Sequence, residues 1–157
     1  MAAPFRAAVD GGSRGNPGTA AWAVVVLDAR GKLLEGHGGL IGHSTNNVAE
    51  YQSLLEALKL ASERGADSVE ILADSELIVR QVRGRYKVRH PDLIPLHAEV
   101  MRRIVGFRSF SIVHVPREEN READRLVNRV LDRASETAPG DTLHVYQLAD
   151  AAATGDS

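Results

Sequence analysis

The segment AAVDGGSRGNPG, residues 7–18, is the stretch that most strongly constrains the fold. It begins inside an apolar run that favours a β-strand, and this run meets a carboxylate at Asp10. Four glycines and a proline follow within the next eight residues, a composition typical of turns. We therefore expect a first strand over residues 5–10 that presents Asp10 at its carboxyl end.

Three more acids occur in comparable settings, each beside a segment expected in the core. Glu50 lies near the start of a predicted helix, Asp74 directly follows the apolar run 69–73, and Asp124 lies in a final amphipathic helix. Glu50 shares its helical face with apolar residues four and seven positions further on, and Asp124 does so at three and seven. Because a lone buried carboxylate is costly, these acids are expected to share a partner.

The periodicity along the rest of the chain predicts one α/β domain. Three early strands with short links imply an antiparallel meander, and helical crossovers place two later strands parallel to the first. We therefore expect a five-stranded mixed sheet with helices on its faces. The expected strands cover residues 5–10, 19–27, 32–40, 69–73 and 110–115, and the expected helices cover about 48–61, 75–82, the region from Pro91–Pro95 to 105, and 118–133.

Composition agrees with a globular domain. Of the 157 residues, 43% are apolar and 25% charged, which allows a substantial core and argues against wholesale disorder. There is no cysteine, which excludes disulfides and thiolate metal sites. No run approaches the eighteen apolar residues of a membrane span, so a cytoplasmic protein is expected.

The charge is divided between a body and a tail. Residues 134–157 hold four of the 21 acids and none of the 19 Lys and Arg residues, so residues 1–133 carry 19 basic and 17 acidic groups, a net charge of +2. We expect a domain over 1–133 and an acidic, linker-like tail over 134–157. Within that tail, the island 143–148 either docks as an edge strand or stays unstructured, and the tail could lead to a further C-terminal domain of a longer protein.

The four acids, in this order and between segments of these types, resemble the ribonuclease H family of type 1. Its members are endonucleases that cut the RNA strand of an RNA/DNA hybrid. The resemblance covers roughly residues 4–133 and implies the ribonuclease H-like fold with strand order 3-2-1-4-5. It also implies hydrolysis by a two-metal-ion mechanism that leaves 5′-phosphate and 3′-hydroxyl ends, with a monomeric enzyme acting on the hybrid as its partner.

Electrostatics supports metal binding at such a cluster. Two carboxylates about 4 to 5 Å apart repel by about 3 to 4 kcal/mol at an effective dielectric of about 20, and a whole domain is stable by only about 5 to 15 kcal/mol. All-oxygen ligands suit Mg²⁺ or Mn²⁺. By resemblance, Asp10 binds two ions, Asp124 helps to hold the ion that activates water, and Glu50 and Asp74 hold the ion that faces the leaving 3′ oxygen.

The resemblance further implies contacts to the minor groove of the hybrid. A ribose 2′-hydroxyl donates and accepts hydrogen bonds, as an Asn amide does, and its presence separates RNA from DNA. The same side chains could instead be helix caps and turn formers. The residues assigned to substrate by this resemblance are Gly11, Gly12, Asn16, Thr45, Asn46 and Asn47.

A basic segment over residues 80–89 suits the phosphates of the DNA strand. It holds five cations, among them Arg83, Arg85 and Lys87, with Tyr86 and no acid. A solvated basic turn is the alternative. Many bacterial relatives carry a longer basic insertion here, so weaker and more salt-sensitive binding is expected of this chain.

One family feature lacks a clear counterpart. Many relatives place a histidine on a loop before the last aspartate, and an ungapped count puts His114 there. Because Val115 and Pro116 fit the strand end better, we favour Arg117 as the auxiliary residue.

Two further functions remain open from the sequence. Related folds serve transposases, integrases and structure-specific nucleases, so the substrate could differ. A hybrid-binding module with a decayed site is the third interpretation, and it predicts the loss of at least one of the four acids. All four are present.

Overall fold

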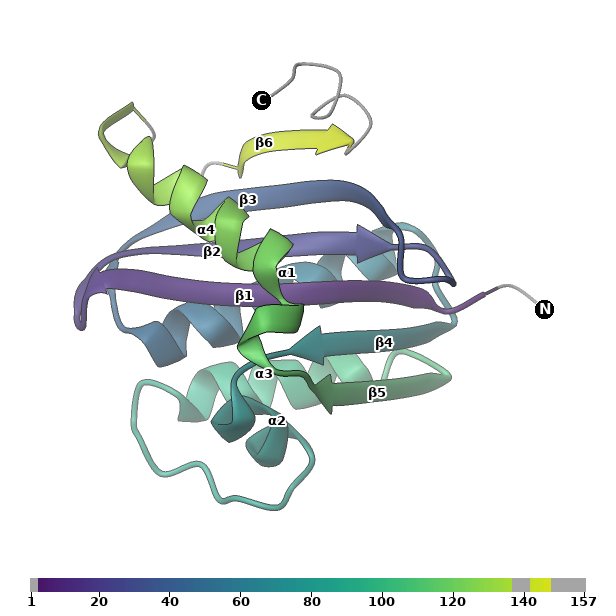
Figure 1. Cartoon of the computed structure of the whole chain (residues 1–157). Helices are drawn as coiled ribbons and strands as arrows, with labels where there is room; N and C mark the ends of the chain where they lie inside the picture. Colours follow the sequence, from purple (N-terminus) through teal and green to yellow (C-terminus); the bar gives the residue numbers. More distant parts are fainter. Residues whose placement is uncertain (1–2, 137–141, 148–157) are drawn as a thin grey trace.

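The computed structural model describes residues 3–136 and 142–147. Figure 1 shows one twisted sheet with α4 in front of it and α1 and α3 behind it. The strands are β1 (Phe5–Gly15), β2 (Gly18–Leu27), β3 (Leu33–Ser44), β4 (Ser68–Ala73), β5 (Ser109–His114) and β6 (Thr142–Gln147). The helices are α1 (Asn46–Glu63), α2 (Glu76–Val82), α3 (Ile94–Ile104) and α4 (Arg121–Asp132), with short 3₁₀ turns at Arg117–Glu119 and Ala134–Glu136.

The sheet order is β5-β4-β1-β2-β3-β6. Pairing is antiparallel from β1 to β2 and from β2 to β3, and parallel from β1 to β4 and from β4 to β5. The expected order 3-2-1-4-5 is therefore confirmed. A sixth strand is added, because β6 pairs antiparallel with β3 along Glu35–Gly39 (Figure 1). Residues 137–141 and 148–157 of the expected tail lie outside the described residues.

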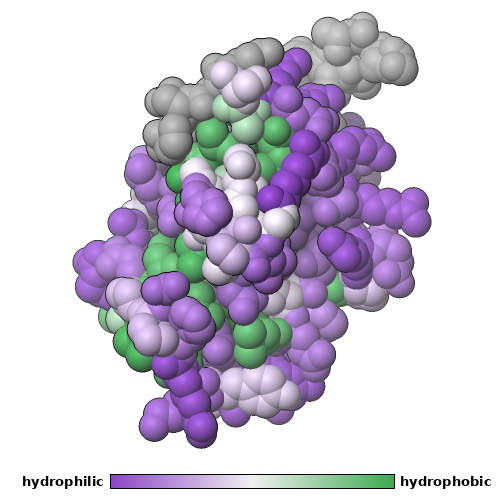
Figure 2. Space-filling model, turned by 90° about the vertical axis from the view of Figure 1, so that its left-hand side faces the viewer, coloured by the Kyte–Doolittle hydropathy of each residue, from purple (hydrophilic) through white to green (hydrophobic). Residues whose placement is uncertain are grey.

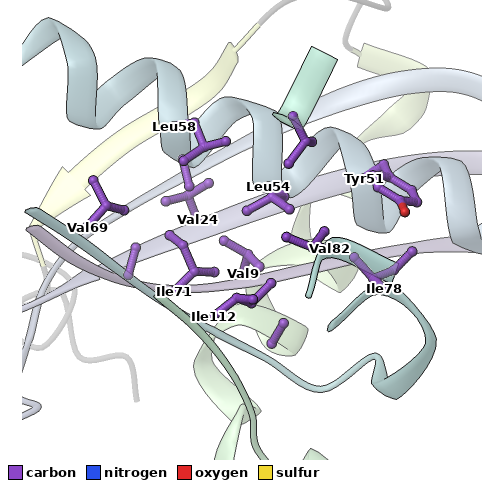
Figure 3. Packing of buried hydrophobic residues seen from close by; sticks show 14 of the residues in the cluster. Val9, Val24, Tyr51, Leu54, Leu58, Val69, Ile71, Ile78, Val82 and Ile112 are labelled. Atoms are coloured by element: carbon purple, nitrogen blue, oxygen red, sulfur yellow. The ribbon is translucent and has the colours of Figure 1, made fainter. Parts of the chain in front are cut away.

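The larger core lies between α1 and the sheet. Tyr51, Leu54 and Leu58 recur at helical spacing and are fully buried. They pack against strand residues such as Val9 and Ile71, as Figure 3 shows. Each leucine buried in this way contributes about 1.5 to 3 kcal/mol. This packing fixes the position of α1 against β1. It therefore also fixes the positions of the side chains at the start of α1.

A second core lies on the other face of the sheet under α4. Leu126, Val127 and Val130 pack there against small strand residues such as Ala21 and Ala23. Gly38 belongs to this contact, because a Cβ atom on it would lie 2.8 Å from Cγ2 of Val130. The glycine lets α4 lie close to β3. None of the helices in the described residues is long and apolar enough to cross a membrane.

The first strand differs from the expectation. It continues past Asp10 to Gly15, and the turn is confined to Asn16 and Pro17. Gly11 and Gly12 remain extended because residues 11–15 pair in register with β2. Asp10 still lies at an edge of pairing, since the parallel ladder between β1 and β4 ends at Val9 and Ala73.

The last helix also differs from the expected continuous segment over 118–133. A 3₁₀ turn at Arg117–Glu119 precedes α4, and Asn120 separates the two. The third strand is longer than expected and runs to Ser44, so that it ends directly before the cap of α1.

Candidate active site

Two strands and one helix bring three of the acids together. Asp10 and Asp74 each follow the last residue pair of the parallel ladder between β1 and β4, so they lie at the same level of two neighbouring strands. Glu50 comes from the second turn of α1, which begins where the Thr45 hydroxyl accepts a hydrogen bond from the Val48 amide at 3.2 Å. The main chain of Gly11 donates to Oε1 of Glu50 at 2.8 Å.

The close approach of α1 to β1 depends on Gly11. A Cβ atom there would lie 2.2 Å from both the carbonyl carbon and the oxygen of Ala49. Such a distance is far inside van der Waals contact, so only glycine lets the helix bring Glu50 this near. Asp10, Glu50 and Asp74 each place a carboxylate oxygen within 4.8 Å of the others.

The fourth acid lines the same cleft. The cleft has a volume of about 460 Å³, and Asp124 contributes to its wall together with the other three carboxylates. Asp10 is the most buried of the four, with 6% of its surface exposed. Asp124 acts on Asp10 from the α4 side, since it both repels the Asp10 charge and shares a hydrogen bond with it.

Burial and mutual repulsion raise the proton affinity of this cluster. Burial, followed by repulsion from Asp74 and Asp124, raises the pKa of Asp10 to about 8. Burial, followed by repulsion from Asp10 and Asp74, raises the pKa of Glu50 well above its usual value. Burial also raises the pKa of Asp74, which a hydrogen bond from Asn120 and the charge of Arg117 oppose.

These properties fit a site for divalent cations. The donors are carboxylate oxygens, the ligands that hard ions such as Mg²⁺ and Mn²⁺ prefer. Without a cation, the repulsion that raises these pKa values is relieved only by protonation. The carboxylate cluster is therefore suited to bind cations.

Comparison with known proteins gives the family. Residues 8–130 match the model of the reverse transcriptase-like family. Ribonuclease HI of Halobacterium salinarum is 42% identical over 125 residues, which make up 80% of this chain and 63% of that protein. The bifunctional protein Rv2228c of Mycobacterium tuberculosis is 44% identical over 133 residues, 84% of this chain and 36% of that protein.

A solved structure agrees with both relatives. LC11-RNase H1, isolated from compost by a metagenomic approach, has been crystallised in complex with an RNA/DNA hybrid. It matches this chain with a TM-score of 0.78 and 42% identity, over 83% of this chain and 98% of that one. The chain belongs to the ribonuclease H family. It spans less than two thirds of the length of the two curated relatives named above.

In this ribonuclease H chain, the asparagines expected at the substrate form a linked pair at the edge of the cleft. Asn46 accepts hydrogen bonds at Oδ1 from the Ser13 amide at 2.8 Å and the Ser13 hydroxyl at 3.0 Å. The main-chain N–H of Asn46 donates to Oδ1 of Asn16 at 3.0 Å. Both side-chain oxygens are thus engaged, and within the described residues neither Nδ2 group donates to the protein. Each exposed Asn can offer Nδ2 to a ligand.

The other predicted substrate residues differ in their places. Gly11 and Gly12 line the cleft, whereas Thr45 caps α1 and Asn47 is exposed on its first turn. Arg117 also lines the cleft. His114 lies at the end of β5, where it is exposed and does not line the cleft. Its electrostatic effect lowers the pKa of Asp74.

The cations of the basic segment differ in their contacts. Arg80 pairs with Glu76 and lies over the ring of Tyr86, and Arg83 donates from Nε to the Ile112 carbonyl at 2.9 Å. Arg85 and Lys87 are exposed. Figure 2 looks onto the side of the molecule at which β1, β4 and β5 end, and this side is mostly hydrophilic with hydrophobic residues in separate patches.

Sequence reasoning missed part of the cleft wall. Ser13, Arg14 and Asn128 line it, and Arg14 pairs with Asp132 at 2.7 Å. Two periodicities could have found Arg14 and Asn128. Arg14 lies four residues after Asp10 on the same face of a strand, and Asn128 lies four residues after Asp124 on a helix.

Proposed function

We propose that this chain is a metal-dependent endonuclease that hydrolyses the RNA strand of RNA/DNA hybrids and leaves 5′-phosphate and 3′-hydroxyl ends. The observation that carries the proposal is the convergence of three buried or half-buried carboxylates, with oxygens within 4.8 Å of one another, in an open cleft that Asp124 also lines. Membership of the ribonuclease H family and the hybrid bound to LC11-RNase H1 support the substrate.

The residues that would hold two Mg²⁺ or Mn²⁺ ions are Asp10, Glu50, Asp74 and Asp124. When bound, a pair of such ions activates a water and stabilises the attacking and leaving oxygens of a phosphodiester displacement. The protein supplies the frame for this. Gly11 holds Glu50 through its amide, and Asn120 donates to Asp74 at 3.2 Å.

Discrimination between RNA and DNA is assigned to the minor-groove side of the cleft. The side-chain oxygens of Asn16 and Asn46 are engaged, and their Nδ2 groups donate to no described residue and can bond to a 2′-hydroxyl oxygen. DNA has no such acceptor at that position. Gly11 and Gly12, which line the cleft, and the start of α1, with Thr45 and Asn47, complete this proposed surface.

Binding of the DNA strand is assigned to the basic segment. Arg83 is tied to the Ile112 carbonyl, so Arg85 and Lys87 are the cations most available for phosphates. Changing both to Ala should lower hybrid affinity and flatten its dependence on salt, because fewer counterions are released on binding. Fluorescence anisotropy at several salt concentrations measures this, and an unchanged slope would remove the segment from the interface.

Three further assignments complete the proposal. Arg117, at the cleft wall, replaces the loop histidine as the auxiliary group, while His114 stays on β5. Residues 1–133 form the catalytic domain, and 134–157 form an appended tail that could connect to a further domain. The enzyme acts as a monomer in the cytoplasm.

The deciding experiment is cleavage of a labelled RNA/DNA duplex with Mg²⁺ or Mn²⁺. The wild type should cut only the RNA strand, and Asp10→Asn and Asp124→Asn should each lose at least about a hundredfold in kcat, because each removes a charged ligand. Chelation should abolish activity. End analysis of the fragments tests the 5′-phosphate and 3′-hydroxyl.

Each alternative has its own outcome in this assay. Equal cutting of a DNA duplex would favour a nuclease with another substrate. Tight binding of the hybrid without cleavage by either ion would favour a binding module. Undiminished cleavage by both variants would remove the carboxylate cluster from the reaction.

A further inference from the structure

Asn120 is an asparagine at a helix N-terminus that does not cap the helix. It occupies the residue before α4, where the side-chain oxygen of an Asn normally accepts a hydrogen bond from the first turn. No such bond is present at α4. The side chain is instead turned inward, and only 2% of the residue is exposed.

The inward orientation joins three acid-bearing elements. Nδ2 of Asn120 donates to the Val9 carbonyl at 2.9 Å, directly before Asp10, and to Oδ2 of Asp74 at 3.2 Å. Its main-chain oxygen accepts from the amide of Asp124 at 3.1 Å. One residue therefore contacts Asp74 directly and the backbone beside Asp10 and at Asp124.

This arrangement leaves a buried group without a partner. Oδ1 of Asn120 has no hydrogen bond within the described residues, although it is shielded from solvent. An unpaired buried amide oxygen lowers stability, and the missing cap lowers it further. A side chain that served stability alone would use its oxygen at the helix. Local rules broken without local gain are typical of functional positions.

The chemistry of the position favours an amide donor. Asp74 lies among like charges, and a neutral N–H donor holds its carboxylate without cancelling the negative charge that attracts a cation. A carboxylate in place of Asn120 would add repulsion, and an aliphatic side chain would remove the tether. Asn120 itself does not line the cleft, so we expect it to make no contact with the hybrid.

We propose that Asn120 is a positioning residue that fixes Asp74 relative to Asp10 and Asp124 and so prepares the carboxylate cluster for divalent cations. The proposal deepens the proposed function and rests on it. It predicts that loss of the tether weakens binding of the ion before substrate arrives, because Asp74 must then be ordered at the cost of binding energy.

The test is Mn²⁺ binding to the substrate-free protein by isothermal titration calorimetry, together with hybrid cleavage. Asn120→Ala should raise the Mn²⁺ Kd about 10-fold to 100-fold, as loss of a group that orients a metal ligand does elsewhere. The Mn²⁺ concentration for half-maximal cleavage should rise in parallel. kcat should fall at fixed Mn²⁺, while KM for the hybrid stays within about twofold, since Asn120 does not reach the hybrid.

Two controls separate positioning from folding. Val130→Ala removes a buried side chain from the same helix without touching Asn120, so it should lower the melting temperature and leave the Mn²⁺ Kd unchanged. Asn120→Ser keeps a short hydroxyl donor and should recover part of the lost affinity. If Asn120→Ala does not fold, the comparison of Asn120→Ser with the wild type decides.

The outcomes also separate this inference from the activity. A folded Asn120→Ala or Asn120→Ser protein with wild-type Mn²⁺ affinity would overturn the role of Asn120, whatever the protein cleaves. A wild-type protein that binds Mn²⁺ but cleaves no hybrid would instead contradict the nuclease assignment. In that case the calorimetric comparison still decides whether Asn120 positions Asp74.

Discussion

At the scale of single residues, the site is defined by an unfavourable placement of charge. Asp10 is buried in the middle of β1 and shares the cleft with three further acids. Burial, followed by repulsion from Asp74 and Asp124, raises its pKa to about 8. An unfolded chain would ionise this group near 3.8. Between these values the folded metal-free protein holds a proton that the unfolded chain has released, so the site itself makes stability depend on pH and on cations.

The sign of that dependence is a prediction. With chelator present, the free energy of unfolding should fall as pH rises from about 4 to about 8, because the folded state binds the extra proton. Asp10→Asn removes the group that must ionise, so at pH 8 it should be more stable than the wild type by a few kcal/mol, at about 1.4 kcal/mol for each unit of pKa.

Urea unfolding at several pH values measures both effects. Adding Mg²⁺ or Mn²⁺ at pH 8 should raise the stability of the wild type and narrow the difference from Asp10→Asn, because a cation replaces the proton as the neutralising charge. A variant no more stable than the wild type at pH 8 would contradict this account of Asp10.

At the scale of elements, the distance between α1 and β1 sets the site. The helix carries Glu50 and the strand carries Asp10, and Gly11 is the point at which their backbones meet. The neighbouring Gly12 differs, since a Cβ atom there would lie 3.6 Å from Cγ1 of Val127, an ordinary contact. Two adjacent glycines thus have different structural requirements.

This difference predicts unequal losses of stability when each glycine is changed to alanine. Gly11→Ala should destabilise the protein by about 2 kcal/mol or more, because a methyl group must push α1 away from β1. It should also reduce activity through displacement of Glu50. Gly12→Ala, the matched control, should stay within about 1 kcal/mol of the wild type in chemical denaturation. Equal stabilities of the two variants would show that the helix is not seated on Gly11.

At the scale of the whole molecule, the two hydrophobic clusters under α1 and α4 draw on β1 to β5 and on the helices. Among the residues whose side chains the structure describes, the last one packed against either cluster is Ala134. β6 adds main-chain pairing to the outer edge of β3 (Figure 1). The edge strand therefore extends the sheet on the side opposite β5, and a chain without it keeps all of these cluster residues.

A shortened chain tests this division. A protein ending at Glu136 should fold cooperatively and retain cleavage of the hybrid, because the four carboxylates and both cores remain. Hydrogen exchange should speed up at the amides of Glu35–Gly39 that face β6, which become an open edge. The full chain is the control, and loss of the cooperative transition in the shortened chain would show that β6 is part of the folding unit.

Much of this protein could be predicted from local patterns. The spacing of apolar residues along the chain predicts three features. These are the helix α1 with its Thr45 cap, the strand before Asp74, and the antiparallel strands up to β3. The parallel placement of β4 and β5 followed from the single hand of crossovers between parallel strands, whereas the order 3-2-1-4-5 came from the resemblance to the ribonuclease H family. The four acids were named because each interrupts such a pattern.

Other features depended on contacts between distant parts of the chain. β1 runs past Asp10 because β2 pairs with its glycines, and residues 142–147, which cover most of the expected island, form a strand because they pair with the edge of β3. The role of Asn120 is of the same kind, since its side chain leaves its own helix for Val9 and Asp74. Local sequence specifies the torsional and hydrophobic preferences of each segment. Pairing, close backbone approach and the choice of hydrogen-bond partner were decided only when those segments met in space.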